Sequence, residues 1–577
     1  MLKIFKRYLK YYKKEVIFGP MFKLLEAIFE LLVPLIMADI VDNGIKANNT
    51  AYVWKMGGVL LIIAVVGLCT TLVCQALAAK ASQGVGTRLR NDCFMVINSF
   101  SFQELDEYGV STLLTRINND VNQLQLGVAM LIRLVIRAPF LVIGATVMAA
   151  LISWEIALIF VFSSIIVGVV VLLIMRKTVP LNKVVQKNLE STTTITKENL
   201  SGIRVVKAFN HQNEEKQRFD NEVNVLKKNA IFVGLISAFL NPVSTIVINV
   251  AIIVVLYLSS NYVYDGLMSQ GDVTALFNYL NQILVAVMVV CNLIVIFAKA
   301  SACGSRVYEI LQKKSSITDG KFDSYGDGDN IFEFKNVSFQ YKTASKPTLN
   351  NMTFTIKENE FIGVVGGTGS GKSTLMAVMS RYYDATSGEV YYCGRNIKDY
   401  KLSFIHKSIG AVLQKANLAN QTIKENLLWG NKEATDDDLN KALKIAQAYD
   451  FVYKSSEGLN REIYQGGKNL SGGERQRLCI ARALVKNPKV LILDDSLSAL
   501  DFKTDLMLRS ELHKLKMTTI MITERISSIK NADKIIVLDN GNIIAIGTHD
   551  KLLSECSLYK EIYDSQAKED YDEKQSV

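Results

Sequence analysis

Six long apolar stretches occupy much of the first 300 residues of this 577-residue chain. Each is long enough for an α-helix to cross the hydrocarbon core of a bilayer, which takes about 20 residues. The stretches cover residues 16–40, 57–79, 131–153, 156–175, 231–258 and 275–298. Any one of them could be a buried helix of a soluble domain, but six in succession predict a helical membrane domain over residues 1–315.

The connections between these stretches predict the orientation. The outer connections are short and poor in positive charge, whereas residues 80–130 and 176–230 form long, charged connections. Because lysine and arginine concentrate on the cytoplasmic side, the N-terminus and the long connections are expected to be cytoplasmic. The sequence therefore predicts a multi-pass protein of the cell membrane, with helical extensions that reach into the cytoplasm.

The overall charge fits the same setting. The chain is 49% hydrophobic and carries a formal charge of +10, which could indicate a nucleic-acid partner. Its N-terminal lysines lie beside apolar runs, however, and no motif that reads a nucleic-acid groove is present. We therefore expect a basic amphipathic helix on the surface of a lipid bilayer and no nucleic-acid partner.

Polar side chains interrupt the predicted membrane helices. They include Glu26, Glu30, Arg133, Arg137, Asn278, Asn281 and Gln282. Such groups usually face protein or a water-filled cavity. For the charged residues, snorkelling to the interface and contact with a substrate are both compatible with the sequence. For the amides, cavity lining and hydrogen bonds between helices stay open.

A different composition begins after Ser315. Residues 316–330 form a polar, glycine-rich linker, and from residue 331 to 565 short β-rich runs alternate with helical patterns. This alternation predicts an α/β domain with a largely parallel sheet. The charged residues 566–577 are expected to be a disordered tail.

A phosphate-binding loop follows the apolar run that begins at Phe361. Its GxxxxGK[ST] pattern lies between a predicted strand and a predicted helix, where backbone amides, the helix N-terminus and a lysine can hold phosphates. The candidate nucleotide-binding residues are Gly366, Gly367, Thr368, Gly369, Ser370, Gly371, Lys372, Ser373 and Thr374. The pattern predicts a P-loop NTPase domain that binds ATP, with Ser373 as a ligand of Mg²⁺.

A buried carboxylate completes the metal site in this prediction. Residues 490–493 are apolar and lead directly to Asp494. A strand of this kind delivers the acidic residue that holds Mg²⁺ beside a P-loop. We therefore expect Asp494 and Ser373 to share the ion.

The run from Leu470 to Arg477 resembles the signature of the ATP-binding cassette (ABC) transporter family. With six membrane helices ahead of the cassette, the resemblance to the exporters of that family covers essentially the whole chain. It implies that Ser471, Gly472, Gly473 and Glu474 contact a nucleotide held by the P-loop of a second half-transporter. It also implies that ATP binding and hydrolysis drive a small amphipathic substrate, such as a drug, lipid or peptide, out across the membrane.

The same resemblance assigns three further residues. Tyr341 would stack on the adenine ring. Gln414 would sense the γ-phosphate and contact Mg²⁺. Asp501 would lie in the loop that crosses the interface between two cassettes.

Two catalytic positions depart from the family. Asp495 stands where the family has a glutamate, which sets the carboxylate back by about 1.5 Å, one carbon–carbon bond. Glu524 stands where the family has a histidine, and a glutamate there brings negative charge towards the phosphates. A milder change places Gln465 where many exporters carry a glutamate. General-base geometry tolerates little misplacement, so we expect this site to bind ATP and Mg²⁺ but to turn over slowly.

The chain most resembles the degenerate-site subunit of a heterodimeric bacterial exporter. Its near-consensus signature would complete the active site of a different partner chain with intact glutamate and histidine positions. Two alternatives stay open, namely a homodimeric exporter that hydrolyses ATP slowly through Asp495, and an ATP-binding sensor or gated channel without sustained transport.

Overall fold

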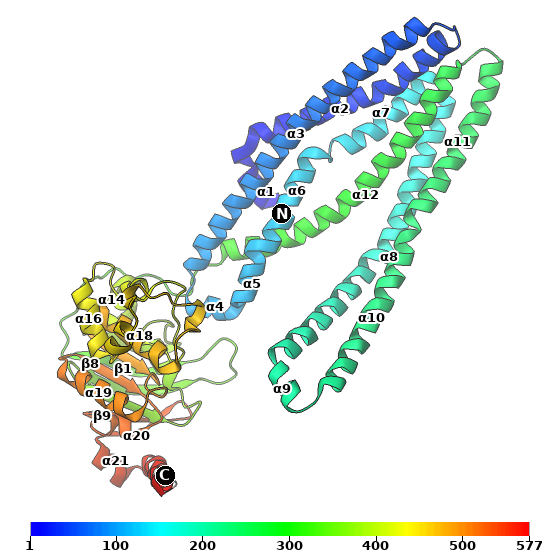
Figure 1. The fold of residues 1–577 in the computed structure, drawn as a ribbon. Helices are drawn as coiled ribbons and strands as arrows, with labels where there is room; N and C mark the ends of the chain where they lie inside the picture. Colours follow the sequence, from blue (N-terminus) through cyan, green and yellow to red (C-terminus); the bar gives the residue numbers. More distant parts are fainter. Residues whose placement is uncertain (1, 576–577) are drawn as a thin grey trace. The chain divides into compact units, whose positions relative to one another are not determined.

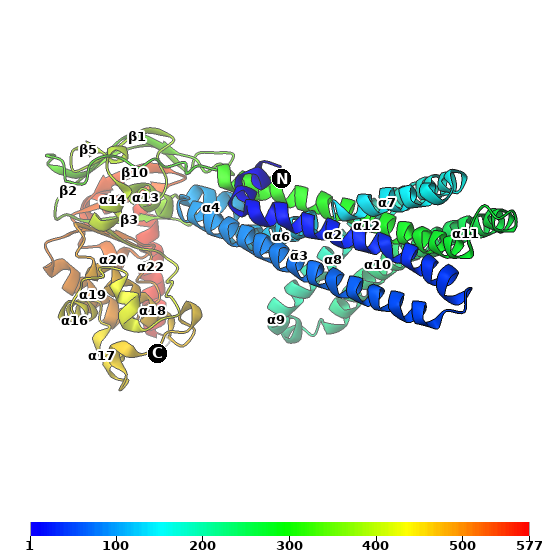
Figure 2. The same cartoon turned by 90° about the horizontal axis from the view of Figure 1, so that it is seen from above.

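The computed structural model describes residues 2–575, and these form two compact units (Figures 1 and 2). The first unit contains Met1–Asn98 and Val110–Lys313, and the second contains Ser99–Gly109 and Lys314–Val577. The segment 99–109 thus groups with the C-terminal domain, whereas the sequence places it in the membrane domain. The linker boundaries at 316 and 330 stay a prediction.

All regular secondary structure among the described residues of the first unit is helical. Its helices are α1 (Leu2–Tyr8), η1 (Leu9–Tyr12), α2 (Lys13–Asp39), η2 (Ile40–Ile45), α3 (Thr50–Asn98), α5 (Val110–Thr115), η3 (Arg116–Asp120), α6 (Val121–Arg133), α7 (Arg137–Ile152), α8 (Trp154–Ser201), α9 (Ile203–Ala208), α10 (Gln212–Ala238), α11 (Leu240–Tyr264) and α12 (Gln270–Gln312). Figure 2 shows the longest of them, α3, α8 and α12, extending along the unit.

Five helical segments among residues 2–575 are long and apolar enough to cross a membrane. They are Thr50–Asn98, Val110–Ile152, Trp154–Ser201, Gln212–Tyr264 and Gln270–Gln312. The first predicted span lies in α2, where Lys23, Glu26 and Glu30 lower the hydropathy. With 27 residues, α2 is nevertheless long enough to cross a bilayer, as the sixth predicted span requires.

The third span is broken between α6 and α7 at residues 134–136. Pro139 explains the break, because it has no N–H to donate to the carbonyl of Val135 and its ring crowds that carbonyl. The flanking bonds persist, with the amide of Ala138 donating to the carbonyl of Leu134 at 3.0 Å. The break separates Arg133, at the end of α6, from Arg137, at the start of α7.

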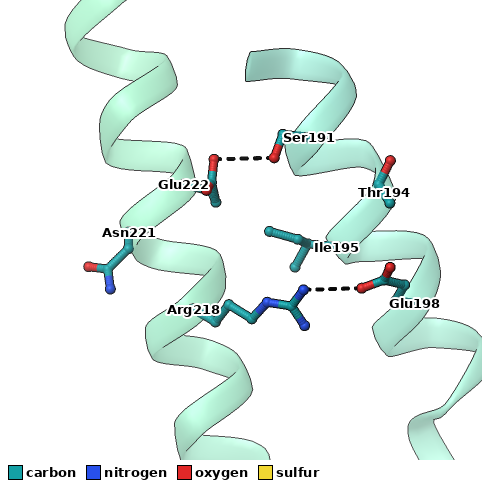
Figure 3. Close-up of a pocket in the computed structure, with 7 residues that line it drawn as sticks. All are labelled: Ser191, Thr194, Ile195, Glu198, Arg218, Asn221 and Glu222. Carbon is teal, nitrogen blue, oxygen red and sulfur yellow. Dashed lines mark hydrogen bonds and ion pairs between the residues drawn. The ribbon is translucent and has the colours of Figure 1, made fainter. Parts of the chain in front are cut away.

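The long connection 176–230 is helical, as predicted. It consists of the end of α8, the short helix α9 and the first two-thirds of α10. A cavity of about 550 Å³ lies between α8 and α10, and Figure 3 shows the side chains that line it. Polar contacts join the two helices there, since Arg218 Nη2 lies 3.2 Å from Glu198 Oε2 and Ser191 Oγ lies 3.4 Å from Glu222 Oε2.

The second unit contains two sheets. The larger sheet has the order β10-β9-β3-β8-β7-β6, and its strands are parallel except for β10, which pairs antiparallel with β9. The smaller antiparallel sheet, of order β2-β1-β4-β5, was not predicted from the sequence. The strands are β1 (Asn330–Phe339), β2 (Leu349–Lys357), β3 (Phe361–Gly366), β4 (Ser387–Tyr392), β5 (Arg395–Asn396), β6 (Ile409–Val412), β7 (Val490–Asp494), β8 (Thr518–Ile522), β9 (Lys534–Asp539) and β10 (Asn542–Gly547).

Helices of the second unit surround the larger sheet. They are α4 (Phe102–Tyr108), α13 (Lys372–Met379), η4 (Ile397–Asp399), α14 (Leu402–Ser408), α15 (Ile423–Leu428), α16 (Asp436–Ile445), α17 (Tyr449–Tyr453), η5 (Gly458–Asn460), η6 (Gln465–Gly467), α18 (Gly472–Val485), α19 (Phe502–Lys514), α20 (Ile526–Ile529), α21 (His549–Glu555) and α22 (Ser557–Gln575). The predicted α/β architecture is confirmed, and the strands predicted before the P-loop and at residues 490–493 appear as the parallel strands β3 and β7.

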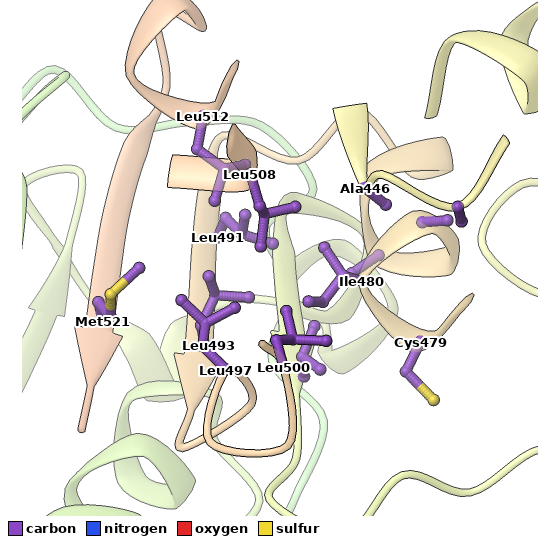
Figure 4. Close-up of a cluster of buried hydrophobic side chains, with 14 of the residues drawn as sticks. Ala446, Cys479, Ile480, Leu491, Leu493, Leu497, Leu500, Leu508, Leu512 and Met521 are labelled. Carbon is purple, nitrogen blue, oxygen red and sulfur yellow. The ribbon is translucent and has the colours of Figure 1, made fainter. Parts of the chain in front are cut away.

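The core of the second unit fixes the end of β7. Leu491 and Leu493 of β7 are fully buried in one cluster with Ile480 of α18 and Leu508 of α19 (Figure 4). Burying each such side chain contributes roughly 1.5–3 kcal/mol. This packing holds Asp494 in place at the carboxyl end of the strand.

Helix α22 runs from Ser557 to Gln575. The disorder expected of residues 566–577 stays a prediction.

Candidate functional site

The P-loop joins β3 to α13, as the sequence predicts. Gly369 and Gly371 adopt φ values of +82° and +101°, a left-handed conformation that L-residues with a Cβ rarely adopt. Lys372 opens α13, and its Nζ donates to the carbonyl oxygens of Gly366 at 2.7 Å and Gly367 at 2.8 Å. The ammonium group is therefore held above the loop rather than extended into solvent.

A cavity of about 290 Å³ brings the predicted catalytic and metal residues together. Its lining comprises Thr348, Thr368, Gly369, Gly371, Lys372, Ser373, Thr374, Gln414, Asp494, Asp495 and Glu524. These residues come from distant parts of the sequence and meet at the carboxyl ends of the parallel strands. That edge is where α/β domains generally bind their ligands. The roles assigned to the residues stay predictions, but their convergence is a feature of the fold.

Asp494 lies almost fully buried in this cavity, with 3% of its surface exposed. Burial raises the pKa of its carboxyl group, and the neighbouring Asp495 raises it too, whereas a hydrogen bond with Ser373 and the charge of Lys372 lower it. The net shift is upward. A carboxylate that is costly to ionise when bare favours a bound cation, which supports the assignment of Asp494 and Ser373 to Mg²⁺.

Asp495 adopts a left-handed backbone conformation with a φ of +45°. Its amide donates to the carbonyl of Ile522 at 2.8 Å, and its own carbonyl accepts from the hydroxyl of Ser498 at 2.8 Å. These bonds lock the turn after β7. The turn places the Asp495 side chain at the cavity, but a carboxylate on this backbone has one carbon less reach than a glutamate would have.

Glu524 lies directly against the P-loop. Its Oε1 is 3.2 Å from the Nζ of Lys372 and 3.3 Å from the Oγ1 of Thr368. Lys372 is the residue that reaches the β- and γ-phosphates in P-loop proteins. The Glu524 carboxylate therefore pairs with the ammonium group that would otherwise bind the phosphates of a triphosphate. None of the four histidines of the chain lines this cavity.

Tyr341 lies beside the P-loop helix but does not line the cavity. Its hydroxyl is 3.2 Å from the Oγ1 of Thr374, and its ring packs edge-on against Phe339 with centroids 4.8 Å apart. Stacking of Tyr341 on an adenine ring stays a prediction.

The signature segment is preorganised as a helix start. Ser471 caps the N-terminus of α18, since its Oγ accepts from the amide of Glu474 at 3.2 Å and its own amide donates to Glu474 Oε2 at 2.8 Å. This capping box uses the residue by which the signature departs from consensus. Hydrogen bonds from Ser471 and the charges of Arg461 and Arg477 outweigh the effect of burial and lower the pKa of Glu474.

The signature and the P-loop of this chain do not share a cavity. None of Ser471, Gly472, Gly473 and Glu474 lines the cavity that Lys372 lines. Asp501 lies apart from it too, and caps α19 by accepting from the amide of Thr504 at 3.1 Å. The start of α18 is exposed, so its backbone amides could bind a phosphate that comes from outside this cassette.

Two residues at the site were not identified from the sequence. Thr348 lines the cavity from the loop before β2, and no sequence pattern distinguishes it. Gln566 of α22 contacts the loop that carries Glu524, through bonds at 2.6 and 2.9 Å. No sequence pattern distinguishes Gln566, because it lies in a segment that composition alone predicts to be disordered.

The residues present fit ATP and Mg²⁺. Gly367 and Gly369 leave open space where a Cβ would project, and the buried Oγ of Ser370 has no hydrogen-bond partner among the described residues. Lys372 and the start of α13 would hold phosphates, while Ser373, Asp494 and Gln414 would hold the cation. When bound, the nucleotide would supply the phosphate charge on which a facing signature segment can close.

Comparison with known proteins agrees with this architecture. Residues 16–287 match the ABC transporter transmembrane region, and residues 349–498 match the ABC transporter cassette. The chain is 35% identical to an ABC transporter ATP-binding protein, YfiB, of Bacillus subtilis, over 94% of this chain and 95% of that protein. It is 28% identical to an ATP-dependent lipid A-core flippase of Photorhabdus laumondii, over 94% and 93% of the two chains.

A solved structure of a bacterial Atm1-family ABC exporter with ATP bound shares the fold. Its TM-score is 0.80 at 21% identity, with 96% of this chain and 98% of that chain covered. A helical membrane domain followed by a P-loop cassette defines a membrane transport ATPase. The chain belongs to the ABC transporter family and has the fold of its exporters, with a cassette that would be cytoplasmic.

Proposed function

We propose that this chain is the degenerate-site subunit of a heterodimeric ABC exporter of amphipathic substrates. Its own P-loop holds Mg²⁺ and ATP for long periods, and its signature segment completes the hydrolytic site of a partner chain. The observation that carries the proposal is the contact of 3.2 Å between Glu524 Oε1 and Lys372 Nζ.

The contact argues for slow turnover on electrostatic grounds. A carboxylate within hydrogen-bond distance of Lys372 competes with phosphate for the ammonium group and repels the negative charge that develops at the γ-phosphate. Asp495, set back by about 1.5 Å relative to a glutamate, weakens the general base at the same site. Two defects in one cavity slow the hydrolysis of the nucleotide that is bound there.

The signature segment supports the other half of the proposal. Ser471 and Glu474 form a complete capping box, so the start of α18 needs no rearrangement to present its amides. A sound signature beside a defective base is what a subunit requires if hydrolysis takes place at the partner's P-loop. Amphipathic cargo is supported by the lipid A-core flippases among the relatives.

The test is a rescue experiment. The purified full-length chain is assayed for ATP hydrolysis beside the double variant Asp495→Glu with Glu524→His, and a matched sample of each is assayed for MgATP binding. We expect slow hydrolysis by the native chain and a gain of at least roughly 10²-fold in the double variant, in line with the contribution of a positioned general base. Hydrolysis by the native chain at the rate of the double variant would favour the slow homodimer or an intact site instead.

A further inference from the structure

A second cavity, of about 450 Å³, lies among α2, α7 and α12 inside the membrane unit. Most of its lining is apolar, but Glu30, Arg137, Asn278, Asn281 and Gln282 also face it. Glu30 lies midway along the first predicted span and Arg137 lies inside the third, so the charged groups are at membrane depth. Intramembrane charges of this kind usually mark a substrate pathway.

An ion pair forms one wall of this cavity. Arg137 Nη2 lies 2.6 Å from Glu30 Oε2, and Arg137 Nε lies 3.9 Å from Glu26 Oε1. Glu26 is also paired, at 2.5 Å, with Lys23. The sequence left snorkelling and cavity contact open for these residues, and the structure places Glu30 and Arg137 at the cavity.

The missing N–H of Pro34 explains why the side-chain amide of Gln282 lies at the same wall of the cavity. Pro34 has no N–H to donate to the carbonyl of Glu30, four residues earlier. Gln282 Nε2 from α12 donates to that carbonyl instead, at 3.1 Å. This bond leaves Gln282 Oε1 buried at the cavity with no hydrogen-bond partner among the described residues. Gln282 thus lines the cavity and also joins two helices.

The polar atoms that lack a hydrogen-bond partner indicate which kind of ligand would fit this cavity. At the cavity, the buried Nε donor of Arg137 and the acceptor Gln282 Oε1 have no hydrogen-bond partner in the described part of the chain. Leaving such buried groups unpaired is unfavourable, and more so for charged groups. Within residues 16–38 of α2, and in α6 and α7, the cationic groups Lys23, Arg133 and Arg137 outnumber Glu26 and Glu30 by one. An acidic group with a neighbouring hydrogen-bond donor would satisfy these demands.

We propose that this cavity is a binding subsite for the acidic group of an amphipathic anion, a phosphate or carboxylate on an apolar body. The acid binds Arg137 in competition with Glu30, a hydroxyl or amine next to it donates to Gln282 Oε1, and the apolar body contacts Val33, Leu141 and Val285. The inference names the substrate class of the proposed exporter and rests on that proposed function.

The experiment titrates the purified full-length chain, in an uncharged maltoside detergent, with dodecyl phosphate and with dodecyltrimethylammonium. We expect dodecyl phosphate to bind about tenfold more tightly than the cation of equal chain length. Arg137→Gln should remove that preference, whereas Arg176→Gln, at an exposed position on α8, should leave it unchanged. Preference for the cation, or equal behaviour of the two arginine variants, overturns the inference.

A second variant covers the case in which Arg137→Gln does not fold, since that change strips Glu30 of its partner. Glu30→Gln keeps the cation and removes its competitor, so dodecyl phosphate should bind several-fold more tightly; unchanged or weaker binding overturns the inference. Nanodiscs of phosphatidylcholine with and without phosphatidic acid distinguish the source. Competition by phosphatidic acid indicates a lipid headgroup, and its absence with intact dodecyl phosphate binding indicates a soluble amphipath.

MgATP affinity is measured on the same samples. If the native chain binds MgATP but shows no preference for the anion, the result contradicts the subsite and leaves the proposed function unaffected. Failure of the native chain to bind MgATP counts against the proposed function, and the anion titration is then read independently.

Discussion

Gln566 of α22 donates a hydrogen bond of 2.6 Å from its side-chain amide to the backbone carbonyl of Glu524. Its Oε1 accepts from the amide of Ile526 at 2.9 Å. The Gln566 side chain therefore bonds both the carbonyl of Glu524 and the amide of Ile526, in the loop that carries Glu524. The position of Glu524 is set by a helix that lies more than thirty residues further along the chain.

Replacing Gln566 with Ala should loosen this loop. Two hydrogen bonds worth about 1 kcal/mol each are lost, so hydrogen exchange at residues 524–526 should accelerate roughly 5- to 30-fold. Exchange mass spectrometry on the full-length chain measures this. Gln566→Glu, which can still accept from Ile526 but no longer donates, should give an intermediate effect. Equal protection in all three proteins would show that the loop is held by other contacts.

Replacing Glu524 with Gln should strengthen ATP binding. The change removes the carboxylate that competes with phosphate for Lys372. Because the Glu524 side chain is 55% exposed, the gain is limited to that of a solvent-screened pair, at most about 1 kcal/mol or roughly fivefold. Fluorescent ATP titration measures it, with the exposed Glu433→Gln as the control. Tighter binding in both variants would point to a general charge effect rather than to the contact with Lys372.

Replacing Asp494 with Asn should stabilise the chain without nucleotide and abolish stabilisation by Mg²⁺ with ATP. Burial raises the pKa of Asp494 in the folded protein, so the contribution of this group to stability is greatest below its unfolded pKa and is lost as pH rises through the folded pKa. At neutral pH the ionised form is a cost, which asparagine removes. A gain of roughly 1 kcal/mol should raise Tm by about 2–4 °C.

The measurement is a thermal unfolding scan at neutral pH, with and without MgATP, of the native chain and of Asp494→Asn. The exposed acidic residue Asp437 provides the control, as Asp437→Asn should leave both readings unchanged. A lower Tm for Asp494→Asn without nucleotide would contradict the prediction.

Replacing Phe102 with Ala should release α4 from the rest of the second unit. Phe102 stacks on Tyr382 with ring centroids 4.6 Å apart, and the hydroxyl of Tyr383 donates to Asp106 of the same helix. Removing the ring should cost about 0.5–1.5 kcal/mol of aromatic contact in addition to its buried area. Limited proteolysis should then cut residues 99–109 faster, while MgATP affinity stays unchanged. Phe232→Ala, at an exposed position of α10, is the matched control.

Prediction from the sequence succeeded where a short stretch of residues is enough to specify the local structure. Hydropathy predicted six spans; five helical segments of the described chain are long and apolar enough to cross a membrane, whereas α2 has the length but carries charged residues that lower its hydropathy. The P-loop and Asp494 were recognisable because a glycine pattern and an apolar strand each encode their own geometry. The antiparallel sheet of β1, β2, β4 and β5 was missed, since the pairing of β1 with β4, which joins its two pairs of consecutive strands, leaves no local period.

By itself, then, the sequence determined the two-part organisation, the parallel sheet and the identity of the P-loop residues, because these depend on residue periodicity and on motifs of fixed spacing. Only the tertiary structure decided that Glu524 contacts Lys372, that Gln566 holds the Glu524 loop, and that Glu30, Arg137 and Gln282 meet in one cavity. Those contacts join residues that are 42 to 252 positions apart. Their distances are set by the packing of whole helices and strands, which no short stretch of sequence specifies.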